Sequence, residues 1–125
     1  MGMFQIQVTV SNLFAPARSL QDPFWVDTGA FHSYVPEDRL DAIGVKAFGE
    51  REILVADGRV DRRRIGTAVF HLEGFAEDIP CPVIFGPPGS VCLLGATTLE
   101  NFGLAVDPVS KKLKPVTCII AGLSA

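Results

Sequence analysis

An acidic residue that directly follows an apolar run is the first candidate for chemistry in this sequence. Phe24-Trp25-Val26 leads into Asp27, and Thr28, Gly29 and Ala30 follow. Such an apolar run is typical of a buried strand, so Asp27 is predicted at its inner end, where a charge is costly unless it is hydrogen-bonded or shared. Gly29 leaves room for a sharp turn, and Thr28 supplies a hydroxyl that donates and accepts. Asp-Thr-Gly also occurs in ordinary surface turns, but those rarely follow an apolar run.

Three other groups of residues carry side chains that are common in active sites. His32 and Ser33 are adjacent, but neighbours in a strand point to opposite faces, and no nucleophile elbow surrounds Ser33. His71 has acidic neighbours, yet two histidines without ligand spacing support a metal only weakly, so no metal site is predicted. The three cysteines are odd in number and widely spaced, which favours buried, inert thiols in a reducing compartment; they are Cys81, Cys92 and Cys118.

Two motifs in this sequence resemble those of a known family. Asp27-Thr28-Gly29-Ala30, followed by His32-Ser33-Tyr34, resembles the active-site loop of retropepsin-type aspartic proteases, above all the versions from retrotransposons and bacteria. Val91-Cys92-Leu93-Leu94-Gly95, then Leu99 and Gly103 to Asp107, resembles that family's apolar-apolar-Gly motif with its short helix and closing strand. The two motifs stand in the family's order and at about its spacing, so the resemblance covers most of the chain.

The family's chemistry requires two carboxyl groups. One ionised group takes a proton from water, and one protonated group polarises the peptide carbonyl; two carboxyls in contact supply this pair because both cannot ionise easily. The chain has a single Asp-Thr-Gly. Leu93-Leu94-Gly95 has no acid at the matching position, and Asp57 and Asp107 lack a buried approach strand. The resemblance therefore implies a homodimer in which Asp27 meets its twin on a two-fold axis.

An aspartic endopeptidase is the function that the resemblance implies. Its nucleophile would be a water held between two Asp27 carboxyls, with no metal or organic cofactor. Thr28 and Gly29 would support Asp27 through hydroxyl and backbone hydrogen bonds, and Ala30 would lie beside an extended peptide or protein substrate. The alternative is a catalytically inactive dimerisation or peptide-binding module of the same fold. Phe31 keeps that alternative open, because this position is often polar in viral enzymes.

Length and composition indicate one small domain spanning residues 1–125. The chain has 125 residues, 48% of them apolar, which is enough for one core and too few for two ordinary domains. The net charge of −3 gives no electrostatic case for nucleic acid or an anionic membrane. No apolar run approaches the roughly 18 residues of a membrane span, and no signal peptide is visible. A cytoplasmic location is therefore predicted.

The fold predicted for the chain is an all-β, retropepsin-like half-barrel with one or two short helices. Apolar and polar residues alternate from Phe4 to Ser11, which predicts a half-buried strand. Residues 12–22 read as irregular. A short helix is predicted to begin at Pro36, which suits a first helical position, and to end at Gly44.

A long hairpin is predicted next, with strands at 51–56, 59–65 and 68–73. The tight-turn signal Asp57-Gly58 lies at its tip, and by resemblance Ala56, Asp57, Gly58 and Arg59 would form the tip of a flap over substrate. A plain solvent-exposed hairpin is the alternative. Arg62-Arg63-Arg64 is interpreted as a solvated edge that resists strand association, with contact to acidic substrates as the other option.

The last third of the sequence echoes the first motif. Pro80 and Pro82 place the strand at 81–85 at a sheet edge, and 91–94 reads as a second buried strand. Thr97 or Thr98 is predicted to cap a helix that Gly103 ends. Strands are expected at 104–106 and 113–120, and the latter is apolar and unpaired, which makes it a surface for another chain to cover.

Overall fold

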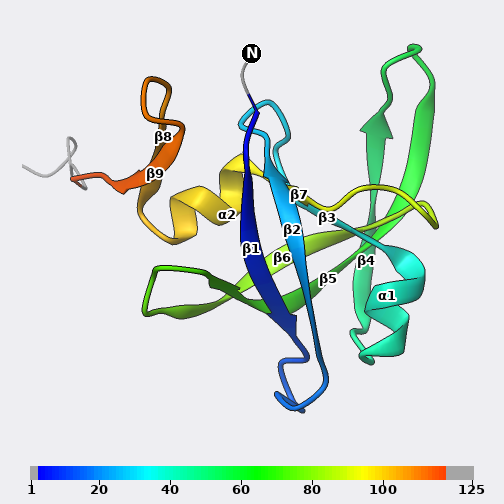
Figure 1. The fold of residues 1–125 in the computed structure, drawn as a ribbon. Coiled ribbons are helices and arrows are strands. Elements are labelled where there is room, and N and C mark those ends of the chain that lie inside the picture. Colours follow the sequence, from blue (N-terminus) through cyan, green and yellow to red (C-terminus); the bar gives the residue numbers. More distant parts are fainter. Residues whose placement is uncertain (1–2, 118–125) are drawn as a thin grey trace, which may run out of the picture.

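The computed structural model describes residues 3–117 of the chain. Strands hold 51% of the described residues and helices 10%, so the structure is mostly β (Figure 1). It has two short helices, where the sequence predicts one or two. In chain order the elements are β1 (Gln5–Ser11), β2 (Ser19–Val26), β3 (Ser33–Pro36), α1 (Glu37–Ala42), β4 (Ala47–Leu54), β5 (Val60–Leu72), β6 (Asp78–Gly86), β7 (Leu93–Leu94), α2 (Ala96–Asn101), β8 (Leu104–Asp107) and β9 (Lys112–Pro115).

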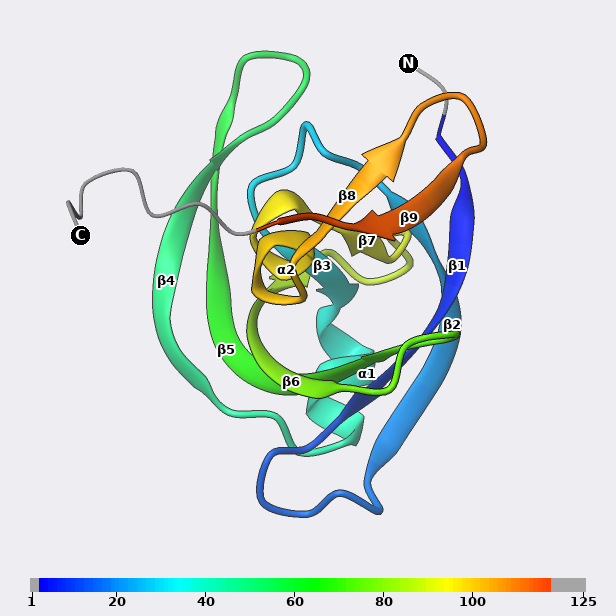
Figure 2. The same cartoon turned by 90° about the vertical axis from the view of Figure 1, so that its left-hand side faces the viewer.

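Six strands close into a ring because β1 pairs antiparallel with both β2 and β5. The order around the ring is β1-β2-β7-β3-β6-β5, and β4 extends the sheet on β5. The pairs β2–β7 and β3–β6 are parallel. Figure 2 shows β4 and β5 on one side of the molecule and β1 and β2 on the other, with β3, β7 and the helices between them. This is the half-barrel predicted from the sequence.

Alternate residues of these strands fill the space inside the ring. Val8 and Val10 of β1 are fully buried, as are Phe70 and Leu72 of β5. The ring of Phe24 meets that of Phe70 edge-on, with centroids 6.3 Å apart, an arrangement that adds to the hydrophobic stabilisation. The period-two pattern at the start of the sequence is thus a strand with one face in the core.

Helix α1 ends where the sequence predicts but begins one residue later, because Pro36 is its N-cap residue and not its first helical residue. It begins after Pro36, and Glu37 and Asp38 place negative charge in its first turn, where the helix dipole favours it. Gly44 follows the helix with φ +78°, a conformation that glycine adopts without the cost of a Cβ, and its N–H donates to the Asp41 carbonyl at 3.0 Å. The stop at Gly44 is confirmed.

Helix α2 ends as predicted but begins differently. Gly103, with φ +65°, follows its last turn. The N-cap residue is Gly95, and no side chain caps the helix, so the prediction that Thr97 or Thr98 caps it is wrong. Thr98 is instead fully buried, and its hydroxyl faces Ser33.

Two segments of the first half are more regular than predicted. The irregular stretch at 12–22 is shorter, because β2 begins at Ser19 and continues the pairing with β1. The two strands predicted at 59–65 and 68–73 form the single strand β5. Gly66 lies at its middle, and a Cβ there would come within 2.6 Å of the Lys46 carbonyl oxygen. Gly66 lies between the two predicted strands and permits close packing within one continuous strand.

The edge position predicted from Pro80 and Pro82 is wrong, because β6 lies between β5 and β3. Strand β3 pairs with β6 only over residues 83–86. Both prolines lie before this stretch, where β5 is the only strand paired with β6. The two prolines are tolerated because, at their positions, β6 has a paired strand on one side only.

Two further strand predictions are corrected near the C-terminal end. The buried strand expected at 91–94 is only the two-residue β7, and Val91 is 57% exposed. The strand expected at 113–120 ends at Pro115 as β9, and it is paired with β8. Residues 118–120 lie outside the described residues.

The cysteines within residues 3–117 are buried free thiols, as predicted. They are Cys81 and Cys92, while Cys118 lies outside the described residues. Burial raises the pKa of both thiols, that of Cys92 to about 11, so both stay protonated near neutral pH. No helix in the described part of the chain is long and apolar enough to cross a membrane.

Candidate active site

Asp27 lies directly after β2, where the chain turns toward β3. Its backbone N–H donates to the Leu94 carbonyl at 3.0 Å and so continues the parallel pairing with β7. Its carboxylate Oδ1 accepts the Gly29 N–H at 3.0 Å, and its carbonyl accepts the Ala30 N–H at 3.1 Å. The carboxylate is thus fixed in a tight turn. Asp27 and Ala30 are half-buried, while Thr28 and Gly29 are exposed.

The second motif, Leu93-Leu94-Gly95, lies directly against this turn. A Cβ on Gly95 would overlap the carbonyl of His32 and come within 2.9 Å of the Ala30 carbonyl oxygen. The N–H of the next residue, Ala96, donates to that same Ala30 carbonyl oxygen at 2.8 Å. Two segments more than sixty residues apart therefore pass at backbone contact, and glycine is required because both obstructing groups are main-chain atoms.

Ser33 is a residue of this region whose role sequence reasoning missed. Its hydroxyl is fully buried, accepts the Gly95 N–H at 3.0 Å and lies 2.5 Å from the Thr98 hydroxyl. Ser33 and Val35 share the inward face of β3, so strand alternation was the signal that Ser33 points into the core and needs a partner. The Ser33 hydroxyl therefore makes structural hydrogen bonds, and, as the sequence indicates, no nucleophile elbow surrounds it.

Phe31, which is exposed, and His32, which is half-buried, follow the Asp27 turn. Phe31 is 71% exposed, and its ring meets the His32 ring edge-on at 4.7 Å. Burial lowers the pKa of His32, and the positive charge of Arg51 on β4 lowers it further. His32 Nδ1 is buried and has no hydrogen-bond partner among the described residues. An uncharged imidazole therefore borders the turn that holds Asp27.

The β4–β5 hairpin has the turn predicted at Asp57-Gly58. The Gly58 N–H donates to the Val55 carbonyl and the Val55 N–H to the Arg59 carbonyl, both at 2.9 Å. Gly58 has φ +88°, and the Asp57 carboxylate receives Arg59 Nε at 2.6 Å. Figure 2 shows the hairpin tip and the β2–β3 loop, which contains Asp27, projecting from the same end of the molecule. Ala56 and the rest of the tip are exposed.

Comparison with solved structures identifies the architecture. The foamy viral protease–reverse transcriptase in complex with an RNA/DNA hybrid matches 93% of this chain with a TM-score of 0.55 and 16% identity. A second foamy viral protease–reverse transcriptase structure, with double-stranded DNA, matches 84% with a TM-score of 0.53 and 18% identity. A retropepsin-like aspartic protease from Rickettsia conorii matches 85% of each chain with a TM-score of 0.50 and 23% identity.

The chain has a retropepsin-like fold. It spans 13% and 18% of the two foamy viral chains and 85% of the rickettsial one. No protein-family model matches the chain, and no curated protein matches it in sequence.

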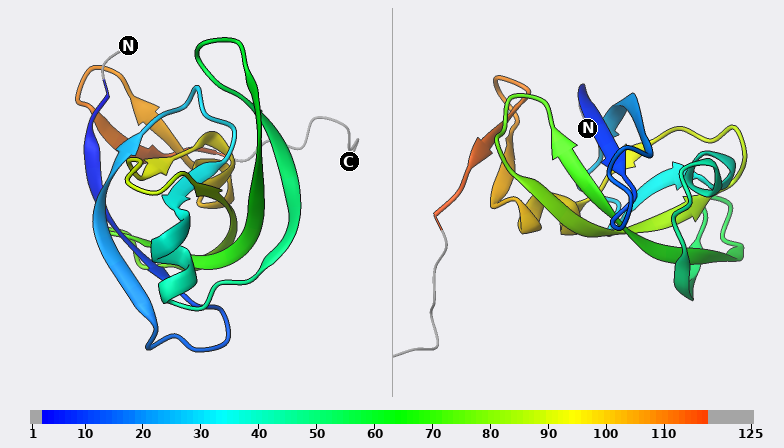
Figure 3. Two further views of the ribbon diagram at one scale, coloured as in Figure 1. Left: turned by 90° about the vertical axis from the view of Figure 1, so that its right-hand side faces the viewer. Right: turned by 90° about the horizontal axis from the view of Figure 1, so that it is seen from below.

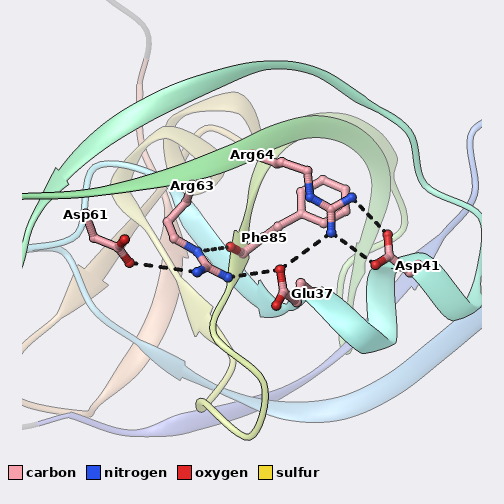
Figure 4. Close-up of polar contacts among 6 residues, drawn as sticks. All are labelled: Glu37, Asp41, Asp61, Arg63, Arg64 and Phe85. Carbon is pink, nitrogen blue, oxygen red and sulfur yellow. Dashed lines mark hydrogen bonds and ion pairs between the residues drawn. The ribbon is translucent and has the colours of Figure 1, made fainter.

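In this retropepsin-like fold an ion-pair network joins the β4–β5 hairpin to the rest of the molecule (Figure 4). Arg63 Nε donates to the Phe85 carbonyl at 2.8 Å, and its guanidinium lies 3.2 Å from the Glu37 carboxylate. Arg64 makes two hydrogen bonds to Asp41, at 3.1 and 3.0 Å, and its guanidinium lies 4.2 Å from the centre of the Phe85 ring. Bidentate and cation–π contacts of this kind fix an arginine in one orientation.

The interpretation of Arg62-Arg63-Arg64 as a sheet edge is wrong, because β5 lies between β6 and β4 and the free edge is β4. Only Arg62 faces outward, toward Glu50 and Glu52 of β4. Arg63 and Arg64 hold β5 against α1 and the end of β6. The network anchors the base of the hairpin and leaves its tip out of these contacts.

Other acids and histidines do not form a second centre in the described residues. Asp57 is engaged by Arg59, and Asp107 accepts the Val109 N–H at 3.0 Å in the β8–β9 turn. His71 Nδ1 lies 2.7 Å from Asp78 Oδ1. No group of three or more His, Cys, Asp or Glu side chains within residues 3–117 is placed to hold a metal ion.

Proposed function

We propose that this chain is an aspartic endopeptidase that works as a homodimer. The observation that carries the proposal is the presentation of Asp27. Its carboxylate is fixed by the Gly29 N–H at the end of a core strand, and the turn that holds it is exposed on its outer side. A single rigid, accessible carboxylate is half of the two-carboxyl device that peptide hydrolysis needs. The retropepsin-like fold of the chain supports this interpretation.

In the proposed dimer the two Asp27 carboxyls face each other across a two-fold axis and hold a water between them. One takes a proton from the water, and the other, protonated, donates a hydrogen bond to the peptide carbonyl. Gly29 keeps each Asp27 in place through its N–H, and Gly95 permits the backbone crossing beside it. In the proposed enzyme the Thr28 hydroxyl would add a further hydrogen bond. An extended peptide would lie along Ala30 and beneath the β4–β5 hairpin, which acts as the flap.

A catalytically inactive dimerisation or peptide-binding module is the second candidate. Phe31 favours it, because a 71% exposed aromatic ring next to Asp27 offers apolar contact area for binding. The two candidates share a fold and a dimer, and they differ in whether Asp27 is needed for turnover.

Cleavage of casein and of a peptide library at several pH values tests the proposal directly. Wild type should cleave, Asp27→Asn should not, and Asp38→Asn should behave as wild type, since Asp38 is an exposed acid on α1. Sedimentation at micromolar concentration should show twice the chain mass for all three. Cleavage that persists in Asp27→Asn would refute the assignment of Asp27, and a cleaving protein that stays monomeric would refute the dimer. Peptide binding without cleavage would favour the second candidate.

A further inference from the structure

A second exposed aromatic surface lies at the opposite end of the molecule from Asp27. Phe14 is 91% exposed, Phe48 is 60% exposed and Leu13 is 39% exposed. Together with Val45, Lys46 and Thr67 they line a cavity of about 230 Å³. Leu13 and Phe14 lie in the β1–β2 loop, Val45 and Lys46 lie in the α1–β4 connection, and Phe48 is near the start of β4. Figure 2 shows this loop and this connection at one end of the molecule and the β2–β3 loop at the other. We call this the Phe14–Phe48 surface.

The Phe14–Phe48 surface is held rigidly from beneath. Asn12 is 8% exposed, and its Oδ1 accepts the N–H groups of Phe14 at 2.8 Å and Ala15 at 3.1 Å. Its Nδ2 donates to the Ile43 carbonyl at 2.9 Å, so one buried side chain joins the two loops. The backbones of these loops lie at the same end of the molecule in the left view of Figure 3. A large aromatic ring on a fixed backbone binds with little further loss of conformational entropy.

The charges around this surface are positive although the chain as a whole carries −3. Lys46 lines the cavity, Arg18 packs against Gly44 beside it, and the Arg51 guanidinium lies 5.9 Å from the centre of the Phe48 ring. None of these three cations has an ion-pair partner among the described residues. The neighbouring acids are already engaged, Asp41 by Arg64 and Glu50 by Arg62.

We propose that the Phe14–Phe48 surface binds a linear peptide segment in which one large apolar side chain is flanked by acidic residues. The apolar side chain would enter the cavity between Phe14 and Phe48, since buried aromatic and aliphatic anchors carry most of the energy of such contacts. The flanking carboxylates would pair with Lys46, Arg18 and Arg51. A second copy of the chain fits this surface poorly, because a two-fold contact here would bring like charges together.

The proposal does not depend on the proposed endopeptidase. A side chain anchored between Phe14 and Phe48 leaves the Asp27 turn uncovered, because the β1–β2 loop and the start of β4 lie at the opposite end of the molecule from the β2–β3 loop (Figure 1). If the chain is also an enzyme, the surface provides a way to hold a partner protein without occupying the active site.

A peptide array provides the test. Each peptide carries one Phe, Leu or Ser at its centre, with Asp/Glu, Ser/Gly or Lys/Arg flanks, and binding of the full chain is measured by fluorescence polarisation. Peptides with Phe or Leu in acidic flanks should bind best, and added salt should weaken them. Phe14→Ser combined with Phe48→Ser should weaken binding roughly tenfold or more. Lys46→Glu should shift the preference away from acidic flanks.

Val109→Ser is the matched control, because Val109 is as exposed as Phe14 at 91% but lies in the β8–β9 turn. It should bind as wild type does. Absence of binding by every peptide, a preference for basic flanks, or equal losses in the Val109 and Phe14/Phe48 variants would overturn the proposal. So would self-association that Phe14→Ser abolishes, since it would make a second copy the occupant.

Discussion

The Ser33 hydroxyl accepts the N–H of Gly95 at 3.0 Å across a separation of 62 residues, and both groups are buried. This bond ties the first residue of β3 to the turn that precedes α2. It therefore fixes the crossing on which Asp27 rests, because the Asp27 turn lies between β2 and β3 and contacts the same Gly95 backbone. The Ser33 hydroxyl thus supports the Gly95 backbone against which the Asp27 turn packs.

Replacement of Ser33 by alanine should destabilise the chain by about 1–3 kcal/mol, because it leaves the Gly95 N–H and the Thr98 hydroxyl buried without their partner. Urea unfolding at fixed protein concentration measures this loss. Thr98→Val removes the other hydroxyl, and the double variant completes a cycle whose coupling energy should be clearly different from zero. Additive losses would mean that the two hydroxyls do not interact in solution.

Gly95→Ala should be far more damaging than its small volume suggests. The added Cβ would meet the main-chain carbonyl of His32, which cannot swing aside, so we expect a loss of about 1–3 kcal/mol or more. Gly49→Ala is the matched control, because a Cβ there has only ordinary contacts at 3.7 and 3.9 Å. NMR amide shifts should move throughout residues 27–33 in the first variant only. Equal stability of both variants would show that the crossing is looser than described.

Local sequence signals predicted the parts of the fold that depend on local physics. The apolar run before Asp27 predicted a buried strand, Gly44 and Gly103 predicted the helix ends, and Asp57-Gly58 predicted a turn. These predictions hold because glycine at positive φ and period-two alternation act within a few residues. The order and spacing of the two motifs further predicted the retropepsin-like fold.

Long-range contacts account for what the sequence did not predict. Ser33 and Thr98 meet only because β3 and α2 pack together, and Arg63 reaches Phe85 only because β6 lies beside β5. The run of three arginines does not itself show which side chains face solvent and which contact a helix. The prolines of β6 likewise suggested an edge position. They are compatible with an inner strand only because β3 pairs with β6 after them, and that pairing is a property of the assembled sheet.

Acid should destabilise the chain through His32. The pKa of His32 in the folded chain is lowered below its unfolded value of about 6.5. When the pH falls below about 6.5, the unfolded chain therefore binds a proton at His32 more readily than the folded chain does. The titration of His32 therefore leaves the free energy of unfolding unchanged at about pH 8 and lowers it as the pH falls through about 6.5. His32→Gln, which does not titrate, should gain stability relative to wild type between about pH 8 and about pH 5. Thermal unfolding at fixed concentration measures this difference, and His71→Gln controls for the other histidine. A difference that stays constant over this range would contradict the prediction.

The role of the β4–β5 hairpin can be separated from its stability by two matched glycines. Gly58 lies at its tip with φ +88°, and Gly74, in the turn between β5 and β6, has φ +90°. A Cβ on either would meet no atom within 4 Å, so alanine at each should cost about 1–2 kcal/mol for the same left-handed backbone.

If the hairpin closes over substrate as proposed, Gly58→Ala should also lower kcat/KM by roughly tenfold on a peptide that wild type cleaves, because a changed tip loses contacts made during turnover. Gly74→Ala should match it in unfolding midpoint and keep wild-type kcat/KM. Equal activity in the two variants would mean that the hairpin is scaffold only, whereas an activity loss in both would trace the effect to stability.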